Sequence, residues 1–185
     1  MGAYVATTPG THLLFADEAW WGLTTEAGRV WTRGARPTLR VSGGRSWTPV
    51  MAAVEPATGR MVSLVAGRFD ARWFGRFLRD VAAAYPGERV ILVVDNAGWH
   101  KARALKVPAN VILWFLPPHS PERNPVERVW LWLREQHTRG VLFRTRAALL
   151  DTLCRGLTAL MDDPPRVRSL TARAVPPAPH PRIPT

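Results

Sequence analysis

The sequence predicts an α/β domain with a mixed sheet, and two patterns along the chain indicate this class. Short apolar runs bounded by turn residues dominate the first part, as in strands. Later segments carry apolar residues three and four positions apart, as in amphipathic helices. The chain has 185 residues, of which 46% are hydrophobic and 21% charged. This length and balance are typical of a folded protein with a sizeable core, and they exclude a disordered chain.

The N-terminal half is predicted to form strands. His12–Ala16 is a short apolar run that leads directly into Asp17. Arg29–Arg33 alternates charged and bulky residues, as a half-buried strand does. Trp47–Val54 and Arg60–Ala66 flank a Pro-Ala-Thr-Gly turn signal, which indicates a hairpin.

Helices and strands alternate in the C-terminal half. Asp70–Tyr85 has helical spacing and stops at a Pro-Gly pair. Arg89–Asp95 and Val111–Leu116 are apolar strands that suit buried parallel positions, with a short helix between them. Pro121–Thr138 and Thr145–Met161 are predicted to be two further helices. Strands followed by this alternation indicate a mixed sheet.

The composition changes at residue 164, which divides the chain into a folded domain (1–163) and a C-terminal tail (164–185). The tail contains seven prolines and four arginines. Because proline removes backbone donors, we expect no regular helix or central strand there. The tail is predicted to be an extended basic arm that can touch a phosphate backbone.

Charge gives the first indication of a partner. Lys and Arg total 25 against 14 acids, a net charge of +11, and all the bases except Lys101 and Lys106 are arginine. Arginine binds phosphate through a planar fork of donors, so the charge favours a polyanion such as nucleic acid. A GC-rich genome, which raises Arg, Ala, Pro and Gly together, is an alternative explanation for the preference for arginine.

Several classes of protein are excluded. The longest apolar runs are too short to cross a bilayer, and no signal peptide is visible at Met1. Cys154 is the single cysteine, so it can form neither an intrachain disulfide nor a Cys-rich zinc site. We therefore expect a cytoplasmic protein of a reducing compartment with no membrane partner.

Three acids stand at positions that suit a metal site. Asp17 and Asp95 each follow an apolar strand, and the carboxyl ends of neighbouring parallel strands meet at one rim of a sheet. Glu127 lies in the first turn of a helix that Asn124 would cap. Carboxylates brought together require a cation, and oxygen ligands suit Mg²⁺ or Mn²⁺. Each acid alone also suits a cap or a turn, and Glu127 could close a capping box onto Asn124.

Three blocks of the sequence resemble those of DDE transposases of the mariner superfamily, in its bacterial insertion sequence 630 branch. The blocks are Phe15–Glu18, Val93–Lys101 and Leu116–Trp130, and the Pro-Pro-His-Ser-Pro and Asn-Pro-Val-Glu strings of the third are the most specific. Arg29–Gly34 is similar to an Arg-x-Trp-x-x-Gly segment of the same family. The resemblance covers roughly residues 12–140.

The resemblance implies an RNase H-like fold, with a mixed five-stranded sheet flanked by helices. It also implies a metal-dependent polynucleotidyl transferase that cleaves DNA and transfers its strands. Asp17, Asp95 and Glu127 would hold Mg²⁺ or Mn²⁺, with two ions activating a water or a 3′-hydroxyl. Its partner would be double-stranded DNA, as transposon ends and target, and the protein would associate with the nucleoid when bound.

Further candidates lie near these acids. His100 would contact the scissile phosphate or orient water, although a loop histidine bonded to backbone is an equal alternative. Glu18 ranks below Asp17, because its side chain would face the other side of the strand. The candidates near the site are Asn96, His100 and Asn124, and those for DNA binding are Trp21, Trp99, Lys101, Arg103, Arg123 and Arg128.

The first acid stands at position 17, which leaves no room before it for the helix-turn-helix region that such transposases carry. We therefore expect end recognition by a helix-turn-helix partner from an upstream reading frame, and assembly as a homodimer. A non-catalytic DNA-binding or regulatory remnant of a transposase is the main alternative function. A different nuclease on the same fold is a third, which the Asn-Pro-Val-Glu string argues against.

Overall fold

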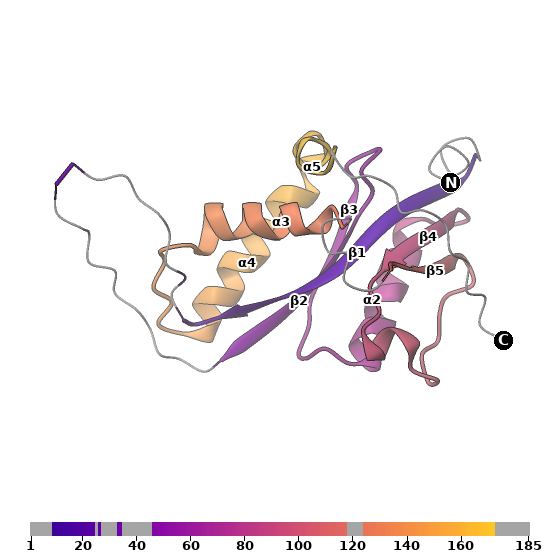
Figure 1. Ribbon diagram of the computed structural model, residues 1–185, viewed down its shortest axis with the longest axis horizontal. Helices are drawn as coiled ribbons and strands as arrows, with labels where there is room; N and C mark the ends of the chain where they lie inside the picture. Colours follow the sequence, from indigo (N-terminus) through magenta and orange to yellow (C-terminus); the bar gives the residue numbers. More distant parts are fainter. Residues whose placement is uncertain (1–8, 25, 27–32, 35–45, 118–123, 173–185) are drawn as a thin grey trace.

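A five-stranded mixed sheet forms the centre of the computed structural model, which describes residues 9–24, 26, 33–34, 46–117 and 124–172 (Figure 1). Its strand order is β3-β2-β1-β4-β5. The strands are β1 (Thr11–Gly22), β2 (Trp47–Val54), β3 (Met61–Val65), β4 (Arg89–Val94) and β5 (Val111–Phe115). β2 pairs antiparallel with β1 and β3, whereas β4 pairs parallel with β1 and β5. The predicted mixed sheet and hairpin are confirmed.

β1 is longer than the predicted strand His12–Ala16, because it pairs with different neighbours along its length. Its parallel ladder with β4 ends at the pair Phe15–Val93, but its antiparallel ladder with β2 continues to Gly22. Asp17 is therefore inside the strand and not at its end. Continued by two residues, the parallel register still places Asp17 level with Asp95, so the two backbones meet at one rim.

One helix, α2 (Ala71–Ala84), covers the first face of the sheet (Figure 1). The Asp70 side chain caps it by accepting a hydrogen bond from Trp73 N at 2.9 Å. The helix buries its apolar side against alternate residues of β1, β2 and β4, among them Leu14, Met51 and Leu92. The predicted helix over Asp70–Tyr85 is confirmed. Its fully buried side chains are Phe74, Phe77, Leu78 and Val81.

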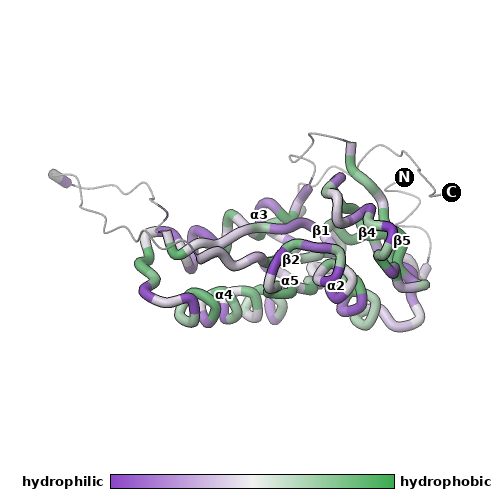
Figure 2. The backbone as a smooth tube through the Cα atoms, turned by 90° about the horizontal axis from the view of Figure 1, so that it is seen from below, coloured by the Kyte–Doolittle hydropathy of each residue, from purple (hydrophilic) through white to green (hydrophobic). Residues whose placement is uncertain are grey.

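Three helices lie on the opposite face: α3 (Val126–Leu133), α4 (Arg146–Met161) and α5 (Pro164–Thr171). A π-helical turn, η3 (Arg134–Thr138), continues α3, so the predicted helix to Thr138 is only partly regular. The hydropathy of α4 alternates as the helix turns (Figure 2), and its buried side faces the sheet. Its buried leucines are Leu149, Leu153, Leu157 and Leu160.

The prediction of no regular helix after residue 163 is wrong for its first eight residues, which form α5. Pro164 and its neighbour occupy the first turn, where a helix needs no backbone donor. Asp163 accepts a hydrogen bond from Arg166 N at 3.0 Å and so caps the helix. Val167 is fully buried in the core shared with α3 and α4, so packing holds this segment helical.

Some predictions fall outside the described residues. Most of the predicted strand Arg29–Arg33, the candidate Arg123 and residues 173–185 of the predicted tail belong to this group. Among the helices that the structure does describe, none combines the length and apolar character needed to cross a membrane.

Candidate active site

Asp17 lies on the face of β1 that packs against α3. Its Oδ2 accepts a hydrogen bond from Trp130 Nε1 at 2.9 Å. Burial and the nearby charge of Glu127 raise the pKa of Asp17 to about 7, against the indole hydrogen bond, which lowers it. Two carboxylates thus share this corner of the sheet. Among the described residues, the one side chain that donates a hydrogen bond to Asp17 is the uncharged indole of Trp130.

Asn124 fixes the start of α3 beside Asp17. Its Oδ1 accepts a hydrogen bond from Val126 N at 3.2 Å, and its Nδ2 donates to Ala16 O at 2.9 Å. The side chain therefore serves as a cap, as predicted, and also ties the helix to β1. The predicted capping box is absent: Glu127 is exposed, and its carboxylate accepts no hydrogen bond from any residue that the structure describes.

Asp95 follows β4 and belongs to a second group of side chains. Its Oδ1 accepts a hydrogen bond from Ala97 N at 2.9 Å and lies 3.0 Å from His100 Nδ1. Glu18 Oε1 lies 2.7 Å from His100 Nε2. One ligand atom from each of Glu18, Asp95 and His100 lies within 4.8 Å of the others. In the described chain, Oδ2 of Asp95 has no hydrogen-bond partner.

A positive charge on His100 offsets part of the negative charge of this second group. Burial lowers the pKa of His100, but the hydrogen bonds to Asp95 and Glu18 outweigh it and raise the pKa to about 9. The same contact with His100 lowers the pKa of Asp95. An imidazolium therefore lies between two carboxylates at neutral pH, with its side chain only 2% exposed.

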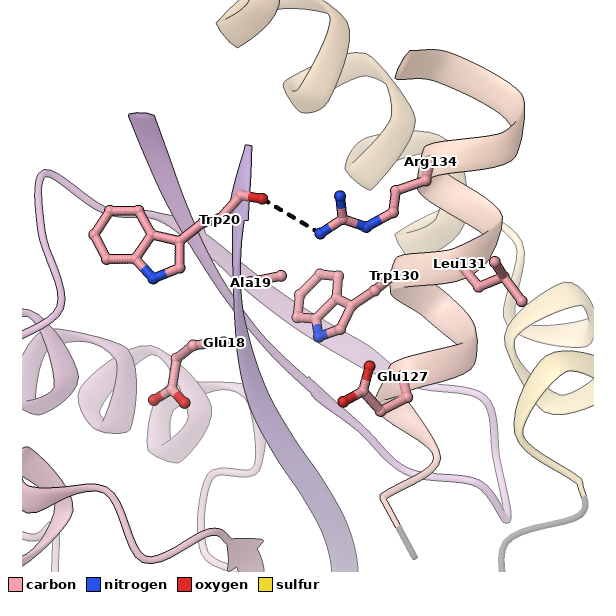
Figure 3. A pocket seen from close by; sticks show the side chains of 7 residues that line it. All are labelled: Glu18, Ala19, Trp20, Glu127, Trp130, Leu131 and Arg134. Atoms are coloured by element: carbon pink, nitrogen blue, oxygen red, sulfur yellow. Dashed lines mark hydrogen bonds between the residues drawn. The ribbon is translucent and has the colours of Figure 1, made fainter. Parts of the chain in front are cut away.

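The predicted triad is thus divided between two groups. Asp17 and Glu127 lie together where β1 meets α3, whereas the carboxylate of Asp95 is turned toward His100. Figure 3 shows Glu18 and Glu127 on opposite sides of β1. A surface hollow crosses the strand between them. It is lined by Glu18, Ala19, Trp20, Glu127, Trp130, Leu131 and Arg134 (Figure 3).

Sequence analysis ranked Glu18 below Asp17 and did not connect it with His100. The alternation of side chains along β1 does place Glu18 on the other face, as expected, but His100 and Trp99 meet it there. Trp99 Nε1 donates a hydrogen bond to Glu18 Oε1 at 3.3 Å. The second sequence block, Val93–Lys101, could have indicated this contact, because residues that follow β4 can reach either face of the neighbouring strand β1.

Asn96 and Lys101 fasten the segment after β4 to the end of β5. Asn96 Nδ2 donates to Leu116 O at 2.6 Å, and Lys101 Nζ donates to Asn96 Oδ1, also at 2.6 Å. Lys101 Nζ also lies 5.2 Å from the centre of the Phe115 ring. Asn96 therefore positions the segment that carries Asp95 and His100.

The prediction of an exposed Trp21 is wrong. Trp21 is 1% exposed and packs edge to face on Trp130, because it shares the core face of β1 with Asp17. The preceding residue, Trp20, is 45% exposed and lines the hollow instead. Trp99 is half-buried. Three of the predicted basic candidates are exposed: Lys101, Arg103 and Arg128.

Residues 12–150 match the sequence pattern of a family described as DDE superfamily endonuclease. The chain belongs to this family. The DDE part of the predicted relationship is therefore confirmed. An uncharacterized protein of Sinorhizobium fredii, y4pE/y4sA, is 34% identical over 128 residues, which are 69% of this chain and 95% of that protein.

Solved structures of Mos1 resemble this DDE endonuclease in fold. A Mos1 strand transfer complex has a TM-score of 0.61 at 17% identity, over 92% of this chain and 57% of the other. A Mos1 mariner paired end complex with Mn has a TM-score of 0.61 at 15% identity, over 88% and 54%. The chain thus spans little more than half of the Mos1 chain. The predicted RNase H-like fold is confirmed.

Proposed function

We propose that this DDE endonuclease is a transposase catalytic domain that cleaves DNA phosphodiester bonds and transfers the strands. The observation that carries this proposal is the Asp17–Glu127 pair at the rim of an RNase H-like sheet. Neither carboxylate has a basic partner among the described residues, and the pKa of Asp17 is raised to about 7. Such uncompensated acids are typical of sites that serve a reaction and not the stability of the fold.

Asp17, Asp95 and Glu127 fit a divalent cation by their chemistry. All three offer hard oxygen ligands, a cation would relieve the repulsion between Asp17 and Glu127, and Oδ2 of Asp95 is free to accept it. Mg²⁺ or Mn²⁺, with two ions expected, would supply an activated water or 3′-hydroxyl and a charge for the leaving oxygen. Mos1 paired end complexes with Mn and with Mg support this choice of metal.

The chain's own residues would orient the substrate. His100, held as an imidazolium by Glu18 and Asp95, is a buried positive charge next to Asp95, and Lys101 adds an exposed one beside it. Both would attract a phosphate toward the three acids. The exposed ring of Trp20 borders the same hollow and would exclude water from one side.

Nicking of supercoiled plasmid with Mg²⁺ or Mn²⁺ tests the proposal. We expect wild type to nick, and Asp95→Asn to be inactive because it removes a ligand charge at almost constant volume. Asp151→Asn is the matched control, since Asp151 is an exposed residue of α4 whose single ion pair, with Arg155, lies on the surface. The control should retain full activity.

Equal nicking by wild type and Asp95→Asn would contradict the proposal. DNA binding without nicking in either metal would favour the alternative, a regulatory remnant that competes for DNA. Assembly as a homodimer, end recognition by a helix-turn-helix partner, membership of the insertion sequence 630 branch and a cytoplasmic location stay predictions. Sedimentation of the purified chain alone and with transposon-end DNA tests the first of them.

A further inference from the structure

The segment 98–110 runs alongside α2 for most of the length of the helix. Near the N-terminal end of α2, the ring centroids of His100 and Phe74 lie 4.1 Å apart. At the next helix residue, Leu105 lies against Gly75. At the C-terminal end of α2, Asn110 Nδ2 donates a hydrogen bond to Tyr85 O at 3.1 Å. Helix and segment therefore form one continuous surface, which begins at the edge of the candidate active site.

This surface, the α2 basic surface, is rich in arginine and lysine. Residues 71–84 and 98–110 together contain a single acid, Asp80. Arg72 and Arg79 stand three residues before and four after Gly75, so they lie on the side of the helix that faces the segment. The six exposed bases of the surface are Arg72, Arg76, Arg79, Lys101, Arg103 and Lys106.

Most of this charge is not neutralised within the described chain. Arg76 pairs with Asp80 at 3.0 Å, an exposed pair of one helix that contributes little. Arg72, Arg79 and Arg103 have no carboxylate within salt-bridge distance among the residues described. The surface therefore keeps a strong positive field, and only an anionic partner would neutralise it.

We propose that the α2 basic surface binds the phosphate backbone of duplex DNA that continues beyond the active site. A helix of fourteen residues is about 21 Å long, and one DNA strand presents about six phosphates over that length. This number is close to the six bases available. Sequence analysis marked Lys101 and Arg103 for DNA binding, and the structure adds the three arginines of α2.

Duplex DNA suits this surface better than an acidic protein does. The bases of α2 form an extended row, and Val107 is the single large apolar side chain exposed in residues 71–84 and 98–110, whereas protein interfaces need a buried apolar centre. The assignment rests on the proposed function, which supplies the DNA. It concerns affinity without regard to sequence, because contacts to phosphate do not read bases.

The test compares two triple variants by fluorescence anisotropy on two unrelated DNA duplexes over a range of salt concentrations. Arg72→Gln, Arg76→Gln and Arg79→Gln remove the charge of α2. Arg144→Gln, Arg146→Gln and Arg155→Gln remove the same charge from exposed positions before and along α4, on the other face of the sheet. The helical dichroism of both variants should match wild type, since every substituted side chain is exposed.

We expect the α2 variant to lower the slope of log affinity against log salt by about three, equally for both duplexes. Its affinity should fall at least about tenfold at about 0.1 M salt. The α4 variant should change the slope by less than about one. Equal losses in both variants would overturn the assignment in favour of bulk charge. An unchanged slope with a loss of self-association would overturn it in favour of a second copy.

The two proposals fail separately. If wild type does not nick plasmid but the α2 variant alone lowers the salt slope, the proposed function fails and the DNA surface stands. If wild type nicks and Asp95→Asn does not, while the α2 variant binds as wild type does, the function stands and the DNA surface is wrong.

Discussion

The two faces of β1 treat neighbouring carboxylates in opposite ways. Asp17 faces α3 and meets another acid, Glu127, and among the described residues its side-chain donor is the uncharged indole N–H of Trp130. Glu18, the next residue, faces α2 and meets His100, which carries a positive charge at neutral pH. The same strand thus holds one pair of acids that repel and one pair of acids with a cation between them.

This difference separates what the fold supplies from what it leaves for a ligand. The Glu18 face supplies a cation of its own, because His100 lies between Glu18 and Asp95. The Asp17 face is incomplete, because burial and like charge both oppose ionisation there. A divalent cation would complete it, and Oδ2 of Asp95 has no hydrogen-bond partner among the described residues.

The largest expected effect is that of Asp17→Asn, which should abolish DNA nicking and yet stabilise the metal-free protein. The folded pKa of Asp17 is about 7, above the ordinary aspartate value of 3.8. The stabilisation that protonated Asp17 provides is therefore complete below pH 3.8 and is lost as the pH rises through about 7. Near pH 8 the variant should unfold with a free energy up to about 4 kcal/mol higher than wild type.

Urea unfolding in EDTA at several pH values measures this effect. The difference between Asp17→Asn and wild type should vanish below about pH 3, where the Asp17 carboxyl is protonated in both the folded and the unfolded chain. Asp151→Asn provides the baseline for an exposed acid that interacts mainly with water. A variant that is less stable than wild type near pH 8 would show that the Asp17 face is not strained by charge.

The second comparison sets Trp21 against Trp20. Trp21 is buried against Trp130, so Trp21→Ala should lower the free energy of unfolding by about 3–5 kcal/mol. Trp20 is 45% exposed and contacts the edge of Phe69, so Trp20→Ala should cost about 1 kcal/mol. Urea unfolding at constant pH measures both. Equal losses would mean that both rings lie in the core.

These residues also mark how far the sequence can be read. Apolar runs located the five strands, and helical spacing located α2 and α4, because burial of one face follows directly from pattern. The three blocks located the acids. Alternation along β1 correctly predicted that Asp17 and Glu18 face opposite ways.

The sequence could not decide which way side chains point once a strand has ended. Asp95 follows β4 by one residue, and its carboxylate turns toward His100 because Ala97 N and the imidazole both bind it. The same limit caused Trp21 to be chosen over Trp20, since strand alternation fixes opposite faces but not which face is the core. α5 was missed because its helix depends on the burial of Val167 and not on propensity.

A further prediction concerns the Glu18 face, where the expected effect is smaller than that of Asp17→Asn. Glu18→Gln removes one of the two anions that raise the pKa of His100 to about 9, so that pKa should fall. Because the folded pKa lies above the ordinary histidine value of 6.5, the charged histidine stabilises the fold fully below 6.5 and loses this effect as the pH rises through about 9. The variant should thus lose about 1–2 kcal/mol near pH 7 and nothing near pH 10.

Titration of the His100 imidazole by NMR measures the shift, with Glu135→Gln as control because, among the described residues, Glu135 forms an ion pair only with Arg139, on the surface of η3. Nicking by Glu18→Gln should fall about 10- to 100-fold, because Glu18 positions His100. Glu18 itself does not lie on the Asp17 face. An unchanged pKa of His100 would mean that Asp95 alone holds the imidazolium. Glu18 would then have no part in the charge of His100, and Glu18→Gln would nick DNA as wild type does.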